Sequence, residues 1–327
     1  MSNPNPSLTL AGTAPPRPTG PAAVDGRAAA AMVALCLVWS LQQISLKAVA
    51  GAASPMLLVA IRSAIVLAML LVLLARRGER PGRGRWKPGA VVGLLFGVEF
   101  LLLTEALRLT QASHVVVFLY TSPIFAALGL HARLPAERLG RLQWAGIGLA
   151  FGGIVAAFLG GGGPAAGQGD GDALLGDMLA LAAGVAWGAT TVAIRCSSLT
   201  TAPASETLAY QLAGAVVLLA PAAWFTGQWR FEPTAVVWLH LAFQVVVVSF
   251  ASFLAWFWLL RRYLASQLGV FSFLTPLFGV VLGAWLLGES LTPAFVLGSV
   301  FVLAGIGLVG GQAGLARWRR RDNRRAP

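Results

Sequence analysis

The chain has 327 residues, of which 57% are hydrophobic and 11% are charged, and its formal net charge at pH 7 is +12. A soluble domain carries roughly 25% charged residues, so this composition excludes an ordinary soluble fold and indicates a membrane protein. The excess of lysine and arginine does not indicate a nucleic-acid partner, because most of these residues form short clusters between apolar runs, where such clusters set membrane orientation.

The N-terminal residues 1–27 are rich in Pro, Ala and Ser and show no hydrophobic periodicity. This composition predicts a disordered cytoplasmic tail. The apolar run that follows is long enough to span a bilayer and has no small-residue cleavage site, so we do not interpret it as a signal peptide.

Apolar segments long enough to span a membrane fill most of the remaining chain. A transmembrane helix needs about 20 such residues. Ten segments meet this requirement approximately, at residues 28–49, 55–75, 88–108, 112–131, 141–159, 173–196, 205–225, 234–260, 264–287 and 291–313. Their connections are too short for a separate extramembrane domain. We therefore expect an all-α membrane protein of ten transmembrane helices.

The basic residues fall on one side of this arrangement. They cluster after the second, fourth, eighth and tenth segments, whereas the opposite connections are nearly uncharged or acidic. Because loops rich in Lys and Arg stay in the cytoplasm, we expect both termini there, including the basic tail 314–327. The protein is thus predicted to cross the cell's inner membrane several times.

The chain contains a long internal repeat, in which residues 105–153 are echoed by residues 258–305. The matches share an offset of 153, or of 152 after one residue drops out of a loop. These pairs are Ala112 and Ala265, Ser113 and Ser266, Phe118 and Phe271, Pro123 and Pro276, Glu137 and Glu289, Gly146 and Gly298, and Gly153 and Gly305. Upstream, offsets of 148 to 149 relate Trp39 to Trp187, Lys47 to Arg195 and Arg62 to Gln211.

Two related halves are the architecture of many membrane transporters. We expect one repeat at 28–159 and the other at 173–313, joined by a Gly-rich linker at 160–172. Since each repeat holds five helices, an odd number, the second repeat is expected to be inverted relative to the first. Glu137 and Glu289 should therefore face opposite sides of the membrane.

The linker does not indicate an enzyme. Its glycines follow no strand and precede no lysine, which argues against a phosphate-binding loop. Gly167–Asp170 matches the G-x-G-D pattern of intramembrane aspartyl proteases, but that chemistry needs two facing carboxylates inside the bilayer. We expect all the aspartates in tails, loops or a helix entrance, namely Asp25, Asp170, Asp172, Asp177 and Asp322.

These features resemble the EamA-type transporters of the drug/metabolite transporter superfamily, over nearly all of residues 28–313. The resemblance rests on the run from Ala106–Leu107 to Ala112–Ser113, on mid-helix Pro123 with its counterpart Pro276, and on Gly288–Glu289. The first repeat departs from the pattern, since it has Ala136–Glu137 without the glycine. The resemblance implies a ten-helix inverted-repeat carrier, often an exporter of amino acids, other small metabolites or drugs.

Arg62 in the second segment and Glu99 in the third are the deepest pair of opposite charges. A charge at the bilayer centre costs about 2.5–3.5 kcal/mol on insertion scales, so such groups are paired or face a cavity. We expect both to face a central cavity, where they pair with each other or bind opposite ends of a zwitterionic substrate. Glu99 is also the candidate for proton coupling. The alternative is a fixed ion pair that orders two helices without touching substrate.

Further candidates for substrate binding combine aromatic rings with hydrogen-bonding groups at matching depth in the two repeats. They are Trp39, Gln42 and Gln43 in the first segment, Tyr120 in the fourth, Trp187 and Thr190 in the sixth, and Tyr210 and Gln211 in the seventh. The alternative is that these residues only join neighbouring helices. Pro123 and Pro276 are candidate kinks and gating points in the fourth and ninth segments.

The remaining polar and aromatic residues are given structural roles. Lys47, at the end of the first segment, is expected to snorkel to the interface. His114 and His131 bracket the fourth segment without metal-ligand spacing, so no metal site is expected. Trp256 is expected in the interfacial belt or in packing.

We therefore predict a secondary transporter, not an enzyme, that moves a small metabolite across the inner membrane by alternating access, with export favoured. The expected partners are a small-molecule substrate, membrane lipid and, as an open alternative, protons. No cofactor is expected, and the protein is expected to be a monomer or a weak homodimer. The alternatives are a multidrug or cation exporter, a metabolite importer of the same fold, and a membrane scaffold or sensor that transports nothing.

Overall fold

The computed structural model describes residues 25–78, 82, 84–135, 138–159, 170–263, 268, 271–272 and 274–322. Within these residues the secondary structure is helical, apart from isolated bridges such as the antiparallel pair Ala53 and Phe231. The predicted all-α fold is confirmed for this part of the chain. The predicted N-terminal tail, most of the Gly-rich linker, Glu137 and the pair Ala265–Ser266 lie outside the described residues.

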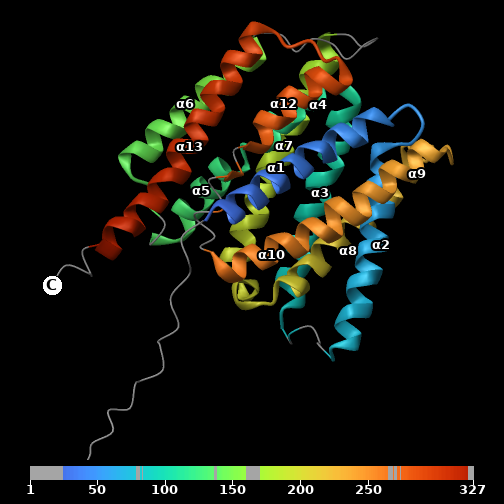
Figure 1. Ribbon diagram of the computed structural model, residues 1–327, viewed down its shortest axis with the longest axis horizontal. Coiled ribbons are helices and arrows are strands. Elements are labelled where there is room, and N and C mark those ends of the chain that lie inside the picture. Colours follow the sequence, from blue (N-terminus) through green and yellow to red (C-terminus); the bar gives the residue numbers. More distant parts are fainter. Residues whose placement is uncertain are drawn as a thin grey trace, which may run out of the picture.

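The helices follow most of the predicted segments to within a few residues (Figure 1). Those of the first half are α1 (Gly26–Ala48), α2 (Pro55–Arg76), α3 (Trp86–Leu109), α4 (Ala112–Leu119), α5 (Ser122–Arg133) and α6 (Arg141–Leu159). Those of the second half are α7 (Asp170–Arg195), the 3₁₀ helix η2 (Ser198–Thr201), α8 (Ala204–Phe225), α9 (Ala235–Ala242), the π-helix η3 (Phe243–Ala251), α10 (Ser252–Arg262), α12 (Leu274–Leu287) and α13 (Pro293–Asp322).

Several of these helices have the length and composition of membrane spans. Among the described residues, seven helical stretches qualify, namely α1, α2, α3, α4 with α5, α7, α8, and α9 with η3 and the start of α10. Leu274–Leu287 and Pro293–Val309 are apolar but shorter. The chain is therefore a multi-pass membrane protein, and the count of ten spans stays a prediction.

The fourth predicted segment is broken just before Pro123, where α4 gives way to α5. Proline has no N–H to donate, so a continuous helix would lose a hydrogen bond here. The hydroxyl of Thr121 instead donates to the carbonyl oxygen of Phe118 at 2.6 Å. Pro276 occupies a similar place, in the first turn of α12. The broken helix places Tyr120 and Pro123 beside the interior of the bundle.

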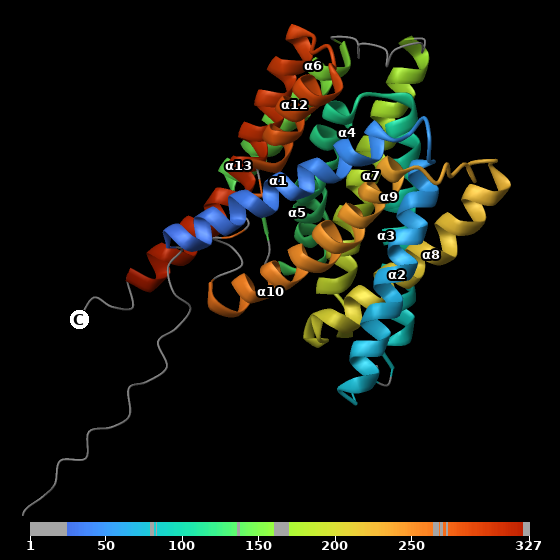
Figure 2. The same cartoon turned by 45° about the vertical axis from the view of Figure 1, so that its right-hand side comes forward.

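α6 and α13 lie side by side and antiparallel, as Figures 1 and 2 show. Their closest approaches are at glycines. A Cβ atom on Gly146 would lie 2.8 Å from the carbonyl oxygen of Gly305, and one on Gly153 would lie 2.6 Å from that of Gly298. Gly146 and Gly298 are counterparts in the sequence repeat, as are Gly153 and Gly305, so each contact is the counterpart of the other. Such reciprocal contacts are expected when a two-fold axis relates two inverted halves.

The two halves interlock through their other helices. α3 of the first half runs parallel to α8 of the second, with Gly93 against the backbone of Tyr210 and Gly97 against that of Gly214. α4 and α5 pack on α7, and α12 packs on α1 and α4. Buried residues of both halves therefore belong to the same hydrophobic core.

Candidate functional site

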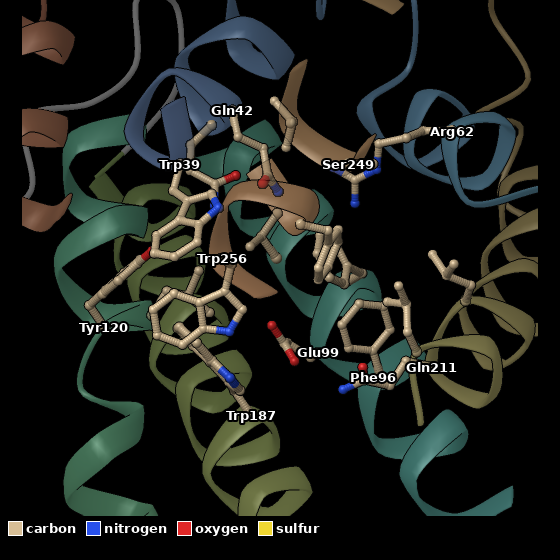
Figure 3. Close-up of a pocket in the computed structure, with 18 of the residues that line it drawn as sticks. Trp39, Gln42, Arg62, Phe96, Glu99, Tyr120, Trp187, Gln211, Ser249 and Trp256 are labelled. Carbon is tan, nitrogen blue, oxygen red and sulfur yellow. The ribbon is translucent and has the colours of Figure 1, made fainter. Parts of the chain in front are cut away.

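A cavity of about 680 Å³ lies between the two halves (Figure 3). Most of the residues predicted for binding or gating line it. They are Trp39, Gln42, Gln43, Arg62, Glu99, Tyr120, Pro123, Trp187 and Gln211. They come from α1, α2, α3, α7 and α8 and from the break between α4 and α5, so segments far apart in the sequence meet around one space.

Glu99 brings a carboxylate into the cavity from α3 (Figure 3). The residue is only 5% exposed. Its Oε2 atom is buried without a hydrogen-bond partner among the described residues. A buried carboxylate oxygen without a partner is costly, so it marks a group that a ligand, a water molecule or a proton completes.

Arg62 reaches the cavity from α2 and is held by two contacts. Its Nη1 donates to Oε1 of Gln244 at 2.9 Å, and its guanidinium lies 5.0 Å from the centroid of the Phe100 ring. Gln244 in turn donates from Nε2 to the carbonyl oxygen of Gln42 at 2.9 Å. One side chain of the π-helix therefore joins α2 to α1 and fixes the direction of the arginine. No pattern in the sequence indicates this role for Gln244.

Arg62 and Glu99 face the same cavity without touching. No ion pair within 4 Å joins them in the described part of the chain. Their charges are close enough to attract each other. The alternative interpretation from the sequence, a fixed ion pair between these two residues, is therefore not the arrangement in this structure. Both charged groups lie at the wall of one cavity.

Aromatic rings form much of the remaining wall. Trp39 and Trp256 pack edge to face with their centroids 5.9 Å apart, and Tyr120 and Trp187 do so at 5.2 Å. Trp39 also donates from Nε1 to Oγ of Ser252 at 3.4 Å. Trp256, for which we expect the interfacial belt or packing, packs on Trp39 and lines the cavity as well.

Three predicted residues do not line the cavity. Thr190 is 2% exposed, and its hydroxyl donates to the carbonyl oxygen of Ala186 in its own helix at 2.9 Å. Tyr210 turns towards α3, where a Cβ atom on Gly89 would lie 2.6 Å from its ring. Pro276 is buried in α12. These residues lie in helices at the predicted segments, but the rotation of each helix about its axis, which packing sets, turns their side chains away from the cavity.

Apolar and small residues of the lining were not among the predicted ones. They are Phe96, Phe100, Leu103, Leu119, Leu208, Leu212, Val248, Ser249, Phe253, Trp256 and Ser272. Single apolar residues in a membrane span carry no individual signal. The repeat offers one signal, since Phe100 and Phe253 are counterparts at the offset of 153 and both line the cavity.

The two halves contribute differently to the cavity. Arg62 and Glu99 both belong to the first half. Their counterparts in the second half are Gln211, at the offset of 149, and Ser252, at the offset of 153, and both are uncharged. The charged groups of the cavity wall therefore come from α2 and α3, whereas the second half supplies aromatic and neutral polar groups.

Two expectations about charges outside the cavity are wrong. Asp177 does not lie in a tail, loop or helix entrance, because it is 1% exposed within α7 and accepts a hydrogen bond from the hydroxyl of Thr110 at 2.6 Å. Lys47 does not snorkel, because its Nζ donates to the carbonyl oxygen of Thr110 at 2.9 Å. Both lie between helices that only the tertiary structure brings together. Across the described residues, no group of three or more His, Cys, Asp or Glu has the arrangement of a metal site.

Comparison with known sequences gives one family and several relatives. The profile of the EamA-like transporter family matches residues 26–159 and again residues 174–311. The uncharacterized transporter YoaV of Bacillus subtilis is 23% identical over 282 residues, which cover 84% of this chain and 94% of the relative. The uncharacterized protein PA1977 of Pseudomonas aeruginosa is 31% identical over 252 residues, which cover 75% of this chain and 79% of the relative.

A further relative has a more informative name. The "Probable amino-acid metabolite efflux pump" of Salmonella typhimurium is 25% identical over 291 residues, which cover 83% of this chain and 90% of the relative. A protein solved by crystallography superimposes on this chain with a TM-score of 0.57 at 22% identity. The superposition covers 86% of this chain and 94% of the solved one. At that identity the likeness shows the fold alone.

Proposed function

The chain belongs to the EamA-like transporter family, and from this premise we propose that it is a secondary transporter of a small zwitterionic metabolite, such as an amino acid or a related amphipathic compound. The cavity between the halves is its substrate site. At about 680 Å³ it falls within the roughly 300–1,000 Å³ range of small-molecule sites.

The observation that carries this proposal is the Oε2 atom of Glu99, which is buried in a largely apolar cavity without a hydrogen-bond partner in the described part of the chain. An ammonium group of the substrate completes it, because opposite charge and hydrogen bonding offset the cost of burying the carboxylate. Arg62 faces the same space with a guanidinium whose Nε also finds no hydrogen-bond partner among the residues that the structure describes. A substrate carboxylate placed near Arg62 and an ammonium placed near Glu99 satisfy both charges, and the aromatic wall receives an apolar side chain.

The architecture supports transport by alternating access. We propose ten transmembrane helices in two inverted five-helix repeats, since the antiparallel, reciprocal contacts of α6 and α13 are those expected of inverted halves. The proposed orientation places both termini in the cytoplasm of a cell's inner membrane, because the basic clusters lie on that side. We favour export, in line with the name of the Salmonella relative, with the protein acting as a monomer or weak homodimer. Import by the same fold is the alternative direction.

The test is the flux of labelled amino acids in proteoliposomes, with and without an imposed pH gradient. We expect saturable flux for the wild type and a loss of at least tenfold for Glu99→Gln. Glu105→Gln is the matched control, because Glu105 lies in the same helix but pairs with Arg108 at 3.6 Å outside the cavity. Unchanged flux in Glu99→Gln would contradict the proposal. Dependence on the pH gradient that disappears with Glu99 would assign proton coupling to this carboxylate.

A second candidate, export of lipophilic cations, is favoured by a specific feature. Trp39, Trp187 and Trp256 line the cavity together with Glu99, and aromatic faces bind organic cations. Arg62→Gln separates the two functions. It should abolish zwitterion flux because the substrate carboxylate loses its partner, whereas cation flux should persist or increase. A wild-type protein that moves no amino acid and no cation would favour a membrane scaffold or sensor.

A further inference from the structure

A second group of ionisable side chains lies outside the cavity, where α3 ends and α4 begins. His114 in α4 is 0% exposed and Asp177 in α7 is 1% exposed. Nδ1 of His114 lies 3.1 Å from Oδ1 and 3.0 Å from Oδ2 of Asp177. The hydroxyl of Thr110 donates to Oδ1 of Asp177 at 2.6 Å. We call His114 and Asp177 the His–Asp pair, and the proposed transport mechanism makes no use of it.

The protonation of the His–Asp pair decides its charge. With a neutral imidazole and an ionised carboxylate, the pair carries one net negative charge in a site closed to solvent. Uptake of one proton, on either group, makes the pair neutral as a whole. Burying a net charge costs far more than burying a neutral pair, so a net negative charge on the pair works against close packing of the helices around it. Because the two groups touch, the proton belongs to the pair rather than to one residue.

In the part of the chain that the structure describes, no neighbouring cation supplies the missing positive charge. Lys47 of α1 is bound to the carbonyl oxygen of Thr110 and is attracted by Glu289, whose carboxylate accepts hydrogen bonds from the first backbone amides of α4. Glu105 and Arg108 of α3 pair with each other. α12 carries no charged residue, and α13 presents Phe295 to the imidazole. Each of these charges is therefore balanced by another, so a bound proton is what can neutralise the negative charge of the His–Asp pair.

The other side of the imidazole indicates more than a structural contact. Nε2 of His114 is buried without a hydrogen-bond partner among the described residues. The ring stacks on Phe295, with centroids 3.7 Å apart and planes 5° from parallel. A histidine that only joined two helices would be expected to satisfy both nitrogens. The face of an aromatic ring also attracts a cation, so this stack accommodates the protonated ring.

The His–Asp pair connects the two halves, since His114 and Thr110 belong to the first half and Asp177 to the second. Gly176, beside Asp177, is packed so closely that a Cβ atom there would lie 2.8 Å from Cβ of Thr110. Separation of α4 from α7 therefore breaks the pair and admits water to it. In the sequence repeat, the counterparts of Thr110, His114 and Asp177 are Tyr263, Gln267 and Ala29, which include no acid and no histidine.

We propose that the His–Asp pair is a proton-binding site that holds this end of the transporter closed when it is protonated. At low pH the pair is neutral and the closed arrangement is favoured. At high pH the net negative charge favours separation of the halves, hydration of both groups and opening. This inference rests on the proposed alternating access but not on the substrate or on Glu99. In the proposed orientation the site faces the outside of the cell, so external acidity closes the outer end.

The test is the pH dependence of opening, measured without substrate on the full chain in lipid nanodiscs. Both native cysteines are replaced by serine, and spin labels are attached to cysteines introduced at Gly51 and Leu174, which are exposed on different halves at this end. Pulsed EPR then gives the distance between the labels. We expect the open-to-closed ratio to rise with pH, by up to roughly tenfold per pH unit for one proton.

Substitutions assign the pH dependence to the pair. Asp177→Asn keeps the hydrogen-bonding atoms without the charge, so the ratio should stay low at every pH. His114→Asn keeps a donor towards Asp177 but takes no proton, so the pH of the transition should move. His240→Asn is the matched control, because His240 binds the hydroxyl of Ser45 at 2.8 Å in α9, and it should leave the wild-type curve unchanged.

Several outcomes overturn the inference. One is a wild-type open-to-closed ratio that does not change between about pH 5 and pH 9. Another is a wild-type pH dependence of that ratio in both Asp177→Asn and His114→Asn. The third is loss of the pH dependence in His240→Asn. If Asp177→Asn does not fold, the wild type and His114→Asn still decide. Opening that follows pH without flux of any zwitterion would contradict the proposed substrate alone. If zwitterions are transported but the open-to-closed ratio does not depend on pH, only the proton site is contradicted.

Discussion

A substitution at Gly214 tests the contact through which α8 and α3 bring the two halves together. A Cβ atom on Gly214 would lie 1.9 Å from the carbonyl oxygen of Gly93. Ordinary contact begins at about 3.4 Å, so Gly214→Ala requires the helices to move apart by roughly 1.5 Å. Overpacking typically costs about 1–3 kcal/mol. Because backbone rather than a flexible side chain must move, we expect a loss of about 3 kcal/mol in the free energy of unfolding.

The assay is a denaturant titration in detergent micelles, followed by tryptophan fluorescence, with amino-acid flux as a second readout. Gly148→Ala is the matched control, because nothing lies within 4 Å of a Cβ atom at this position in α6. Alanine favours a helix over glycine by about 0.8–1.0 kcal/mol, so the control should be at least as stable as the wild type. Since α3 carries Glu99 and α8 carries Gln211, the spread helices should also lower flux. Equal stability of Gly214→Ala and Gly148→Ala would refute the close backbone contact.

Three further substitutions probe individual contacts. Gln244→Leu removes the side chain that accepts a hydrogen bond from Arg62. Because a hydrogen bond to a charged group contributes about 1.5–3 kcal/mol, KM for a zwitterion should rise at least tenfold. An unchanged KM would show that Gln244 is not needed to position Arg62. Glu289→Gln weakens the anionic cap of α4, so the free energy of unfolding, measured by thermal denaturation, should fall by about 0.5–2 kcal/mol. An unchanged free energy of unfolding would count against that cap. Thr190→Val should change KM less than twofold, because the hydroxyl is used within its own helix; a large effect would return Thr190 to the site.

Two signals, the internal repeat and the cost of a charge in a membrane span, made much of the cavity lining predictable from the amino-acid sequence. A charge deep in a membrane span is expensive, so Arg62 and Glu99 stand out against an apolar background. Tryptophans at matching depth in two copies, such as Trp39 and Trp187, marked the two walls of the cavity. These signals work because the bilayer restricts which residues a span tolerates, and because each copy repeats the depth of the other.

The residues that the structure places away from their expected surroundings share a physical cause. Thr190 and Tyr210 were chosen by their place along the sequence of a span, but that place does not fix the direction in which a side chain points. That direction depends on the rotation of a helix about its axis, and close contacts set it, such as that of Tyr210 with Gly89. Asp177 near the start of its helix looked like a solvated residue, and nothing local indicates that Thr110 and His114 cover it.

The sequence by itself determined that this is a multi-pass helical membrane protein made of two related copies, because hydrophobicity, the placement of basic residues and the repeat are local properties of the chain. Only the tertiary structure decided the partners of the buried polar groups. Arg62 meets Gln244 182 positions away, and His114 meets Asp177 63 positions away. Each partnership depends on how whole helices pack across the two halves, and one-dimensional patterns of polarity carry no record of that packing.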